Sequence, residues 1–158
     1  MAIRETDLEE EFVDDHRVMT QTISALLEAL RAGRDAEARE IAEDLDRRAG
    51  PHIAFEEAVM YPQVARVSGE SVAQQLYDEH RTVLAGLEQL LNHRGSTPLG
   101  EEQRAQVIAK MQTGLDHAIS CGSLLSHLTA LDPQIQQQML DRLHEYRREG
   151  TRWTTLHR

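Results

Sequence analysis

The sequence predicts an all-α protein: an up-and-down antiparallel four-helix bundle with an additional C-terminal helix. Three observations favour this fold class. Apolar residues recur at helical spacing through long segments, and few loop signals separate these segments. The chain has 158 residues, a length that suits one main domain. Aromatic residues make up only 4% of the chain, so the core must consist mainly of aliphatic side chains, which suit helices better than sheets.

Loop-forming residues divide the chain into five helical segments. The breaks lie at Gly33, Ser68-Gly69, residues 94–100 and Asp132-Pro133. The segments therefore cover about residues 8–32, 35–67, 70–93, 101–128 and 134–148. Since the first four are joined by short loops, we expect neighbouring helices to run antiparallel. We expect residues 1–131 to form the bundle and residues 132–158 to form a helical extension packed on it.

Each of the first two segments places a histidine on its apolar face. His16 lies four residues after Phe12 and three residues before Met19, so the three side chains point inward together. His52 lies on the inward face of the second segment. Gly50-Pro51 interrupts that segment and should kink it or restart it as a new helix.

The third and fourth segments repeat this arrangement. His80 interrupts an apolar stripe that includes Leu76 and Val83, and His117 shares its helix face with Cys121. The fifth segment carries an apolar stripe of its own, formed by Ile135, Met139, Leu143 and Tyr146. We therefore expect the C-terminal tail to cover an apolar surface, because monomers rarely expose such patches.

Composition excludes several classes of protein. The formal net charge is −10, which disfavours nucleic acid and anionic membranes as partners. One cysteine rules out an internal disulfide framework. The acidic N-terminus does not resemble a signal peptide, and no apolar run approaches the ~18 residues that a membrane span needs. We expect a cytoplasmic protein that is a monomer or a homodimer.

Four histidines and one carboxylate indicate a metal site in the bundle interior. His16, His52, His80 and His117 each lie on a different long segment, and facing helices are where bundles build metal sites. Glu56 follows His52 by four residues, one turn along the same face. A lone buried histidine is more often a satisfied core residue. Four unpaired imidazoles would be costly to bury, and this favours metal binding.

Four stretches of the sequence resemble the successive motifs of the hemerythrin-like (HHE cation-binding) family over roughly residues 8–130. They are Asp14-Asp15-His16-Arg17, the stretch from His52 to Pro62, Glu79-His80-Arg81, and the stretch from His117 to Cys121. The resemblance implies a four-helix bundle around a non-heme di-iron centre. Members of the family bind or react with O2, peroxide or NO, or sense iron and oxygen. The implied metal ligands are His16, His52, Glu56, His80 and His117.

The sequence departs from the family pattern at two places. The fourth helix of the family usually carries a second His-x-x-x-Glu, but here Cys121 stands four residues after His117. The third helix has only His80, with Leu76 and Leu84 at the neighbouring turns, so the chain resembles the bacterial variant with one histidine there.

The replacement at Cys121 leaves several alternatives open. Sulfur reaches less far than a carboxylate, which disfavours bridging of two ions from this position. The thiol could ligate one ion, lie inert in the core, or leave room for a water. We favour an apolar filler beside an open coordination position, where O2, peroxide or NO would bind. The same loss could instead leave a site with one ion of iron or of another divalent metal.

Other polar residues near these motifs are candidates for supporting roles. Tyr61 or Tyr77 could donate to a bound oxygen species or ligate iron, but a half-buried ring with a surface hydroxyl is the simpler expectation for each. Asp15 and Glu57 could orient a ligand histidine, although solvation is the simpler expectation for both. We interpret the remaining histidines, His93, His127, His144 and His157, as lying outside the site.

The leading functional hypothesis is a non-heme iron protein that holds two ions and binds or reacts with O2, peroxide or NO. If the protein is an enzyme, it is a non-heme iron oxidoreductase. The alternative is a non-catalytic module that senses metal or oxygen, or stores iron, and signals through the fifth helix. A degenerate structural bundle is a third reading. A simple hydrolase is disfavoured because no nucleophile motif such as G-x-S-x-G is present.

Overall fold

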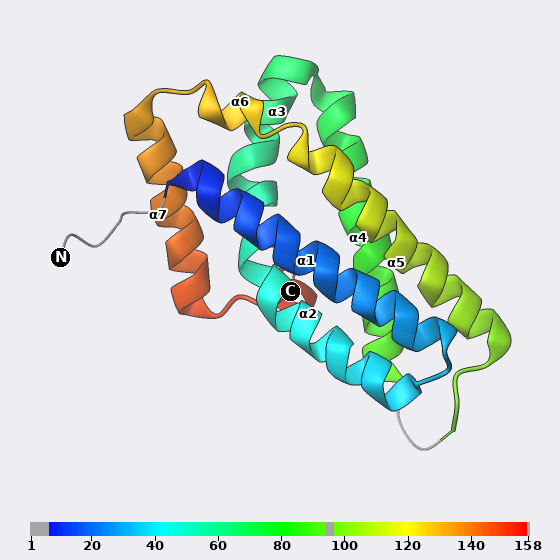
Figure 1. Cartoon of the computed structure of the whole chain (residues 1–158). Helices are drawn as coiled ribbons and strands as arrows, with labels where there is room; N and C mark the ends of the chain where they lie inside the picture. Colours follow the sequence, from blue (N-terminus) through cyan, green and yellow to red (C-terminus); the bar gives the residue numbers. More distant parts are fainter. Residues whose placement is uncertain (1–6, 94–96, 158) are drawn as a thin grey trace.

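The computed structural model describes residues 7–93 and 97–157, and within these residues it is helical without any strand (Figure 1). The elements in chain order are α1 (Leu8–Arg31), α2 (Asp35–Phe55), the π-helix η1 (Glu56–Met60), α3 (Tyr61–Ser68), α4 (Glu70–Asn92), α5 (Glu101–Gly122), α6 (Ser126–Thr129), α7 (Pro133–Glu149) and the 3-10 helix η2 (Trp153–Thr155). The predicted all-α fold is confirmed. No helix among these residues is long and apolar enough to cross a membrane.

Four antiparallel legs form the bundle. They are α1, the continuous stack of α2, η1 and α3, then α4, and finally α5. Helix α1 packs on α2 and α5, while α4 packs on α3 and α5 (Figure 1). The connection between α3 and α4 is the single residue Gly69, whose φ of 99° suits glycine because a side chain would be strained there.

Local chemistry sets the ends of the helices. Asp7 caps α1 by accepting a hydrogen bond from the Glu10 amide at 2.8 Å. Helix α5 ends at Gly122, so the expectation that the fourth segment reaches residue 128 was wrong. Glycine and serine at positions 122 and 123 are weak helix formers. Ser123 Oγ donates to the Ser120 carbonyl oxygen, and such a bond competes with the backbone hydrogen bonds of a helix. The chain then turns into the short α6.

The second leg is interrupted later than expected. Helix α2 runs through Gly50-Pro51 to Phe55, so a restart at this pair was wrong. Gly50 has a different role: a Cβ atom there would collide with the Thr151 carbonyl oxygen, so glycine lets the C-terminal segment lie directly on α2. The interruption is η1, where the Tyr61 amide bonds to the Glu56 carbonyl five residues earlier. Single-turn π-helices of this kind are frequent at functional sites.

Two apolar clusters fill the interior, one toward each end of the bundle. The first includes Met19, Val83 and Met111, and the second includes Phe12, Leu76 and Cys121. On α1, α4 and α5, a histidine stands between the residues of one cluster and those of the other along the chain. A polar layer therefore divides the hydrophobic core.

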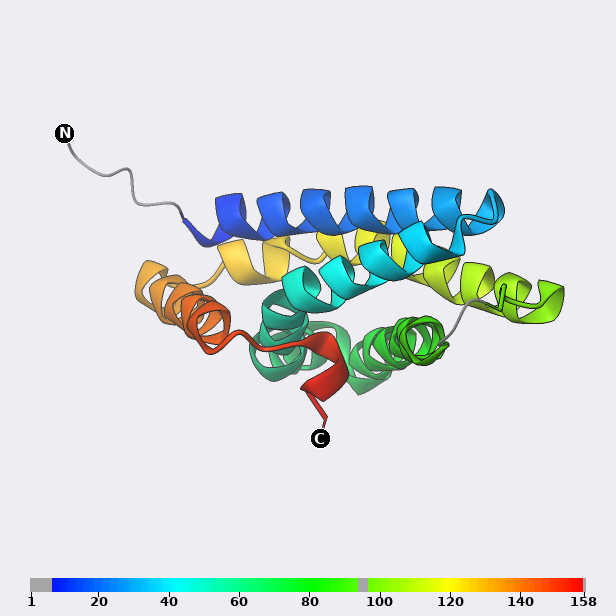
Figure 2. The same cartoon turned by 90° about the horizontal axis from the view of Figure 1, so that it is seen from below.

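The C-terminal extension packs on the bundle. Helix α7 contacts α2 and α1 and buries Leu140 and Leu143. Beyond α7, the chain passes beneath α2, where η2 contacts α2 and α4 (Figure 2). Trp153 in η2 is buried within the first apolar cluster. The expected division of the chain at residues 131 and 132 stays a prediction.

Candidate metal centre

The structure brings the five predicted ligand side chains together in the polar layer. His16 comes from α1, His52 from α2, Glu56 from the first position of η1, His80 from α4 and His117 from α5. All are buried except His16, whose side chain is 11% exposed. Helical phase therefore placed each of them on the correct face.

Glu56 lies at the centre of this group. One carboxylate oxygen, Oε1, is 2.6 Å from His52 Nε2 and 3.2 Å from His16 Nε2. The other oxygen, Oε2, is 3.5 Å from His80 Nε2 and 3.8 Å from His117 Nε2. One carboxylate thus faces the same ring nitrogen of four histidines, two on each oxygen.

The opposite ring nitrogen of each histidine has an acceptor of its own. His52 Nδ1 lies 2.9 Å from Asp15 Oδ2, His80 Nδ1 lies 2.9 Å from Glu57 Oε1, and His117 Nδ1 lies 2.6 Å from Glu79 Oε2. His16 Nδ1 lies 3.1 Å from the Ala118 carbonyl oxygen. In a neutral imidazole, an acceptor at Nδ1 holds the proton there and leaves Nε2 with a free electron pair, which is the usual arrangement of metal-binding histidines.

Three of these acceptors differ from the sequence expectations. Solvation was the simpler expectation for Asp15 and Glu57, and it was wrong because each carboxylate bonds a buried histidine. The role of Glu79 was missed. Helical phase shows which way a side chain points, but not which residues of two helices lie level with one another. The motif Glu79-His80 gave no signal that Glu79 would bond a histidine on another helix.

Tyr61 enters the site directly. Its side chain is fully buried, and its hydroxyl donates to Glu56 Oε2 at 2.5 Å. The same hydroxyl lies 2.9 Å from His80 Nε2 and 3.1 Å from His117 Nε2. The expected surface hydroxyl was therefore wrong for Tyr61. Tyr77 is only partly buried, and its hydroxyl donates to the Glu57 carbonyl oxygen at 2.8 Å, outside the cluster.

The π-helix explains how Tyr61 reaches this position. In an α-helix, five residues rotate the chain by ~500°, so residues five apart point ~140° away from each other. The wider turn of η1 reduces that angle and returns Tyr61 to the face of Glu56. Pro62 was the available signal, because proline has no amide hydrogen to continue an α-helical ladder and is favoured in the first turn of a new helix, as it is in α3.

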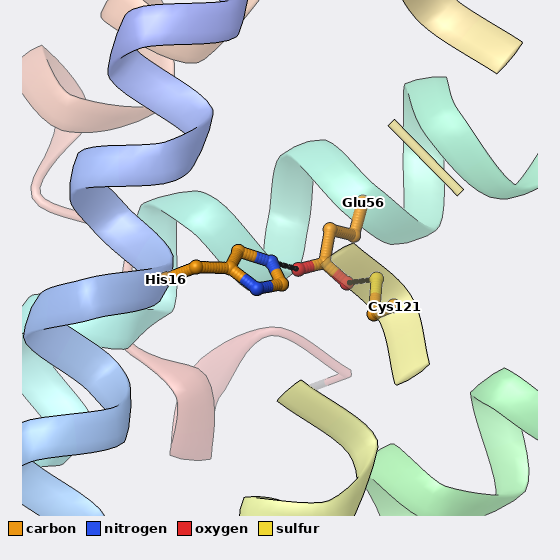
Figure 3. Close-up of side chains that lie close together, drawn as sticks. All are labelled: His16, Glu56 and Cys121. Carbon is orange, nitrogen blue, oxygen red and sulfur yellow. Dashed lines mark hydrogen bonds and ion pairs between the residues drawn. The ribbon is translucent and has the colours of Figure 1, made fainter. Parts of the chain in front are cut away.

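Cys121 also contacts the central carboxylate. Its buried thiol donates to Glu56 Oε2 at 3.2 Å, and its sulfur lies 3.9 Å from the Tyr61 hydroxyl. Figure 3 shows His16 and Cys121 approaching Glu56 from opposite sides, from α1 and α5. In the part of the chain that the structure describes, two groups of three side chains have ligand atoms within 4.8 Å of one another. They are His16, Glu56 and Cys121, and Glu56, His80 and His117.

Comparison with protein families matches most of the chain to a known domain. The model of the hemerythrin HHE cation-binding domain matches residues 7–121, more than half of the chain. The chain belongs to this family. Comparison with curated proteins and with solved structures gave no match.

In this hemerythrin-family centre, the carboxylates and histidines shift one another's pKa values. Burial lowers the pKa of His52, but the Glu56 and Asp15 carboxylates outweigh it and raise this pKa to about 9. Burial raises the pKa of Glu56, but the charge of His52 and the hydrogen bonds of His117, His16 and His52 hold it well below its ordinary value. The cluster therefore keeps an ionised carboxylate and gathers positive charge around it.

The Cys121 thiol and the Tyr61 phenol both stay protonated. Burial, followed by the charge of Glu56, raises the pKa of the Cys121 thiol well above its ordinary value. Burial and the same carboxylate raise the pKa of the Tyr61 phenol well above its ordinary value. Both groups are therefore donors to Glu56 at neutral pH.

The donors of the site fit a bound cation. A phenol has one proton to donate, so Tyr61 cannot donate to Glu56, His80 and His117 together. His52 Nε2 is buried and makes no hydrogen bond to the residues described, although Glu56 Oε1 is only 2.6 Å away. When the histidines are neutral, the electron pairs of several nitrogens and oxygens therefore meet in one place, which is the donor set that a metal ion satisfies.

A small cavity adjoins the centre. It has a volume of about 20 Å³, and a water molecule needs ~10–15 Å³ measured in this way. His16, His80 and His117 line it beside Glu56, while most of the opposite wall is apolar and includes Ile23. The space suits a molecule of two or three atoms.

The remaining histidines have partners outside this centre. His93 contacts the Thr97 carbonyl, His127 contacts Ser68, His144 contacts Glu11, and His157 contacts Glu57. Of these four, only His157 touches a residue that holds a predicted ligand, because Glu57 also bonds His80.

Proposed function

We propose that this protein would hold two iron ions with the histidines around Glu56 and that it binds or reacts with a small oxidant: O2, peroxide or NO. The observation that carries the proposal is the division of the site about Glu56. Its oxygen Oε1 faces His16 and His52, whereas Oε2 faces His80 and His117. A carboxylate that bridges two ions presents its two oxygens in this way.

The choice of iron comes from the resemblance to the hemerythrin-like family, which implies a non-heme di-iron centre. Imidazole and carboxylate donors suit several divalent metals, iron among them. His16 and His52 would hold one ion with Glu56, and His80 and His117 would hold the other. When bound, iron supplies reversible electron transfer and a coordination position for a small oxidant.

The residues of the chain orient the histidines, donate a hydrogen bond and form an apolar wall beside the site. Asp15, Glu57 and Glu79 hold three of the histidines in the tautomer that exposes Nε2. Tyr61 keeps its proton, so its hydroxyl can donate to an oxygen atom placed beside His80 and His117. The apolar part of the cavity wall lowers the local dielectric constant, which strengthens these interactions.

Metal analysis tests the proposal directly. The protein is expressed with iron, and iron per chain is measured together with the visible absorption spectrum. We expect about two ions per chain and a spectrum that changes when peroxide or NO is added. His127→Gln serves as a control, because this histidine lies outside the centre and the variant should keep its iron. A chain that takes up no iron would reject the proposal, and iron without any response to either molecule would reject the oxidant chemistry.

One contact favours the alternative of a sensing module. Asp15 bonds His52 Nδ1 at 2.9 Å and also accepts from Arg147 of α7 at 3.0 Å. A change at His52 can therefore act on the C-terminal helix through one carboxylate. If sensing is the function, loading with iron should change the rate at which a protease cuts α7, while peroxide should not be consumed.

A further inference from the structure

Residues 151–157 lie outside the part of the chain that matches the family, yet they reach the metal centre. Trp153 of η2 is 3% exposed and lines the cavity that adjoins the centre. Its ring meets the ring of His80 edge to face, with the centroids 5.8 Å apart. A residue far along the chain thus completes the wall of the cavity.

A buried carboxylate of α2 fixes this segment in place. Asp46, 3% exposed, accepts from the Thr154 amide at 2.8 Å through Oδ1 and from Thr154 Oγ1 at 3.0 Å through Oδ2. Gly50, one turn further along α2, lets the backbone at Thr151 pack without a side chain between them. Hydrogen bonds as well as apolar packing therefore hold Trp153 in position.

The indole N–H of Trp153 has no partner in the part of the chain that the structure describes. Its Nε1 atom is buried and makes no hydrogen bond there. Buried indole N–H groups usually have a partner, and the residue that carries this unpaired donor lines the cavity, so a ligand held there could provide the acceptor. The other polar groups of this wall are the histidines and Glu56, which are the predicted metal ligands.

We propose that Trp153 is the hydrogen-bond donor that selects and holds the small ligand of the cavity. The ligand is a molecule of two or three atoms with an acceptor atom, placed between the predicted ligand histidines and the indole N–H. This inference rests on the proposed function and adds to it a residue outside the matched domain. Its role is one of positioning, because Trp153 is not a predicted ligand of the metal.

The experiment uses nitric oxide as the probe with the full chain loaded with iron(II) in the absence of oxygen. Trp153→Phe keeps an aromatic ring in the wall but removes the donor. We expect unchanged iron content, a dissociation constant for NO that rises by roughly three- to tenfold, and a shift in the N–O stretching frequency. If the Phe variant loses iron, the same NO measurements are made on Trp153→Leu, which also lacks the donor.

Thr154→Val is the matched control. It removes one of the two hydrogen bonds to Asp46 and leaves the indole in place. Since Trp153 is the one tryptophan of the chain, the quenching of its emission by acrylamide in the metal-free protein reports directly whether the segment stays closed. We expect weak quenching in the wild type and in the control, and the same N–O stretch in both.

The outcomes separate the two proposals. A wild-type chain without iron, or with iron but no response to NO, overturns the proposed function, and this inference with it. A wild type that binds NO while Trp153→Phe keeps its affinity and its N–O stretch overturns only the role of Trp153. Loss of iron in both Trp153 variants would show a structural role and overturn the inference as well.

Discussion

Two stretches of the site have the same spacing, but one ends in a carboxylate and the other in a thiol. His52 is followed after four residues by Glu56, and His117 is followed after four residues by Cys121. The carboxylate of Glu56 comes within 3.8 Å of all four histidines. The thiol of Cys121, by contrast, contacts Glu56 and Tyr61.

The difference shows how a bundle can compensate for a lost carboxylate. The Tyr61 hydroxyl lies closer to His80 and His117 than Glu56 Oε2 does, and Tyr61 follows Glu56 through the π-helix. One stretch of the second leg, residues 52–61, therefore provides an imidazole, a carboxylate and a phenol. Restoring or removing groups on each stretch tests whether this division of roles is correct.

The largest effect is expected for Glu56→Ala. This change removes the carboxylate that both halves of the centre share, so we expect iron content to fall at least tenfold, because outer partners alone are typically worth ~10–100-fold in metal affinity. Iron per chain measured after purification checks it. Glu40→Gln, at an exposed position of α2, is the control and should keep full iron content. Unchanged iron in the Glu56 variant would show that the assignment of the bridge is wrong.

Tyr61→Phe comes next. The variant keeps the ring and removes the hydroxyl that lies between Glu56, His80 and His117. We expect iron content within about twofold of the wild type, but a reaction with peroxide that is roughly ten- to hundredfold slower, as for loss of a positioned proton donor. Stopped-flow absorption measures the rate. Tyr77→Phe provides the comparison, since its hydroxyl bonds a backbone carbonyl outside the cluster; an equal loss in both variants would contradict a specific role for Tyr61.

Changes at Cys121 are expected to be smaller. Cys121→Glu restores a carboxylate one turn from His117, so affinity for the second ion should rise a few-fold while peroxide reacts more slowly. Cys121→Ser should change less, because the side chain stays small. Iron stoichiometry and stopped-flow rates check both variants. Loss of metal in the Ser variant would identify the thiolate as a true ligand, and a Glu variant identical to wild type would show that position 121 does not act on the metals.

The smallest effect concerns the metal-free protein and its pH dependence. The pKa of His52 rises from 6.5 to about 9 on folding, so its proton stabilises the folded state fully below pH 6.5. That stability is lost as pH rises through about 9, and the loss should reach roughly 2–3 kcal/mol by pH 10. Urea unfolding at pH 7 and pH 10 measures it. In His52→Gln, this change in the free energy of unfolding between pH 7 and pH 10 should be absent. If the variant shows the same pH dependence as the wild type, another group is responsible for it.

The sequence was sufficient where periodicity carries the information. The inward face of each helix follows from apolar spacing, and this placed His16, His80 and His117 correctly. It was not sufficient where the answer depends on two helices at once: Glu79 meets His117 across a separation of 38 positions. Tyr61 was missed for a different reason, since a π-turn changes the phase that periodicity assumes.

The approach of Trp153 to the centre also bears on how iron would enter. All five predicted ligands lie within residues 16–117, whereas Trp153, which lines the cavity beside them, follows 36 positions after His117 (153 − 117). Trp153→Ala would keep every predicted ligand and remove this part of the wall. We therefore expect the variant to take up added iron faster than the wild type.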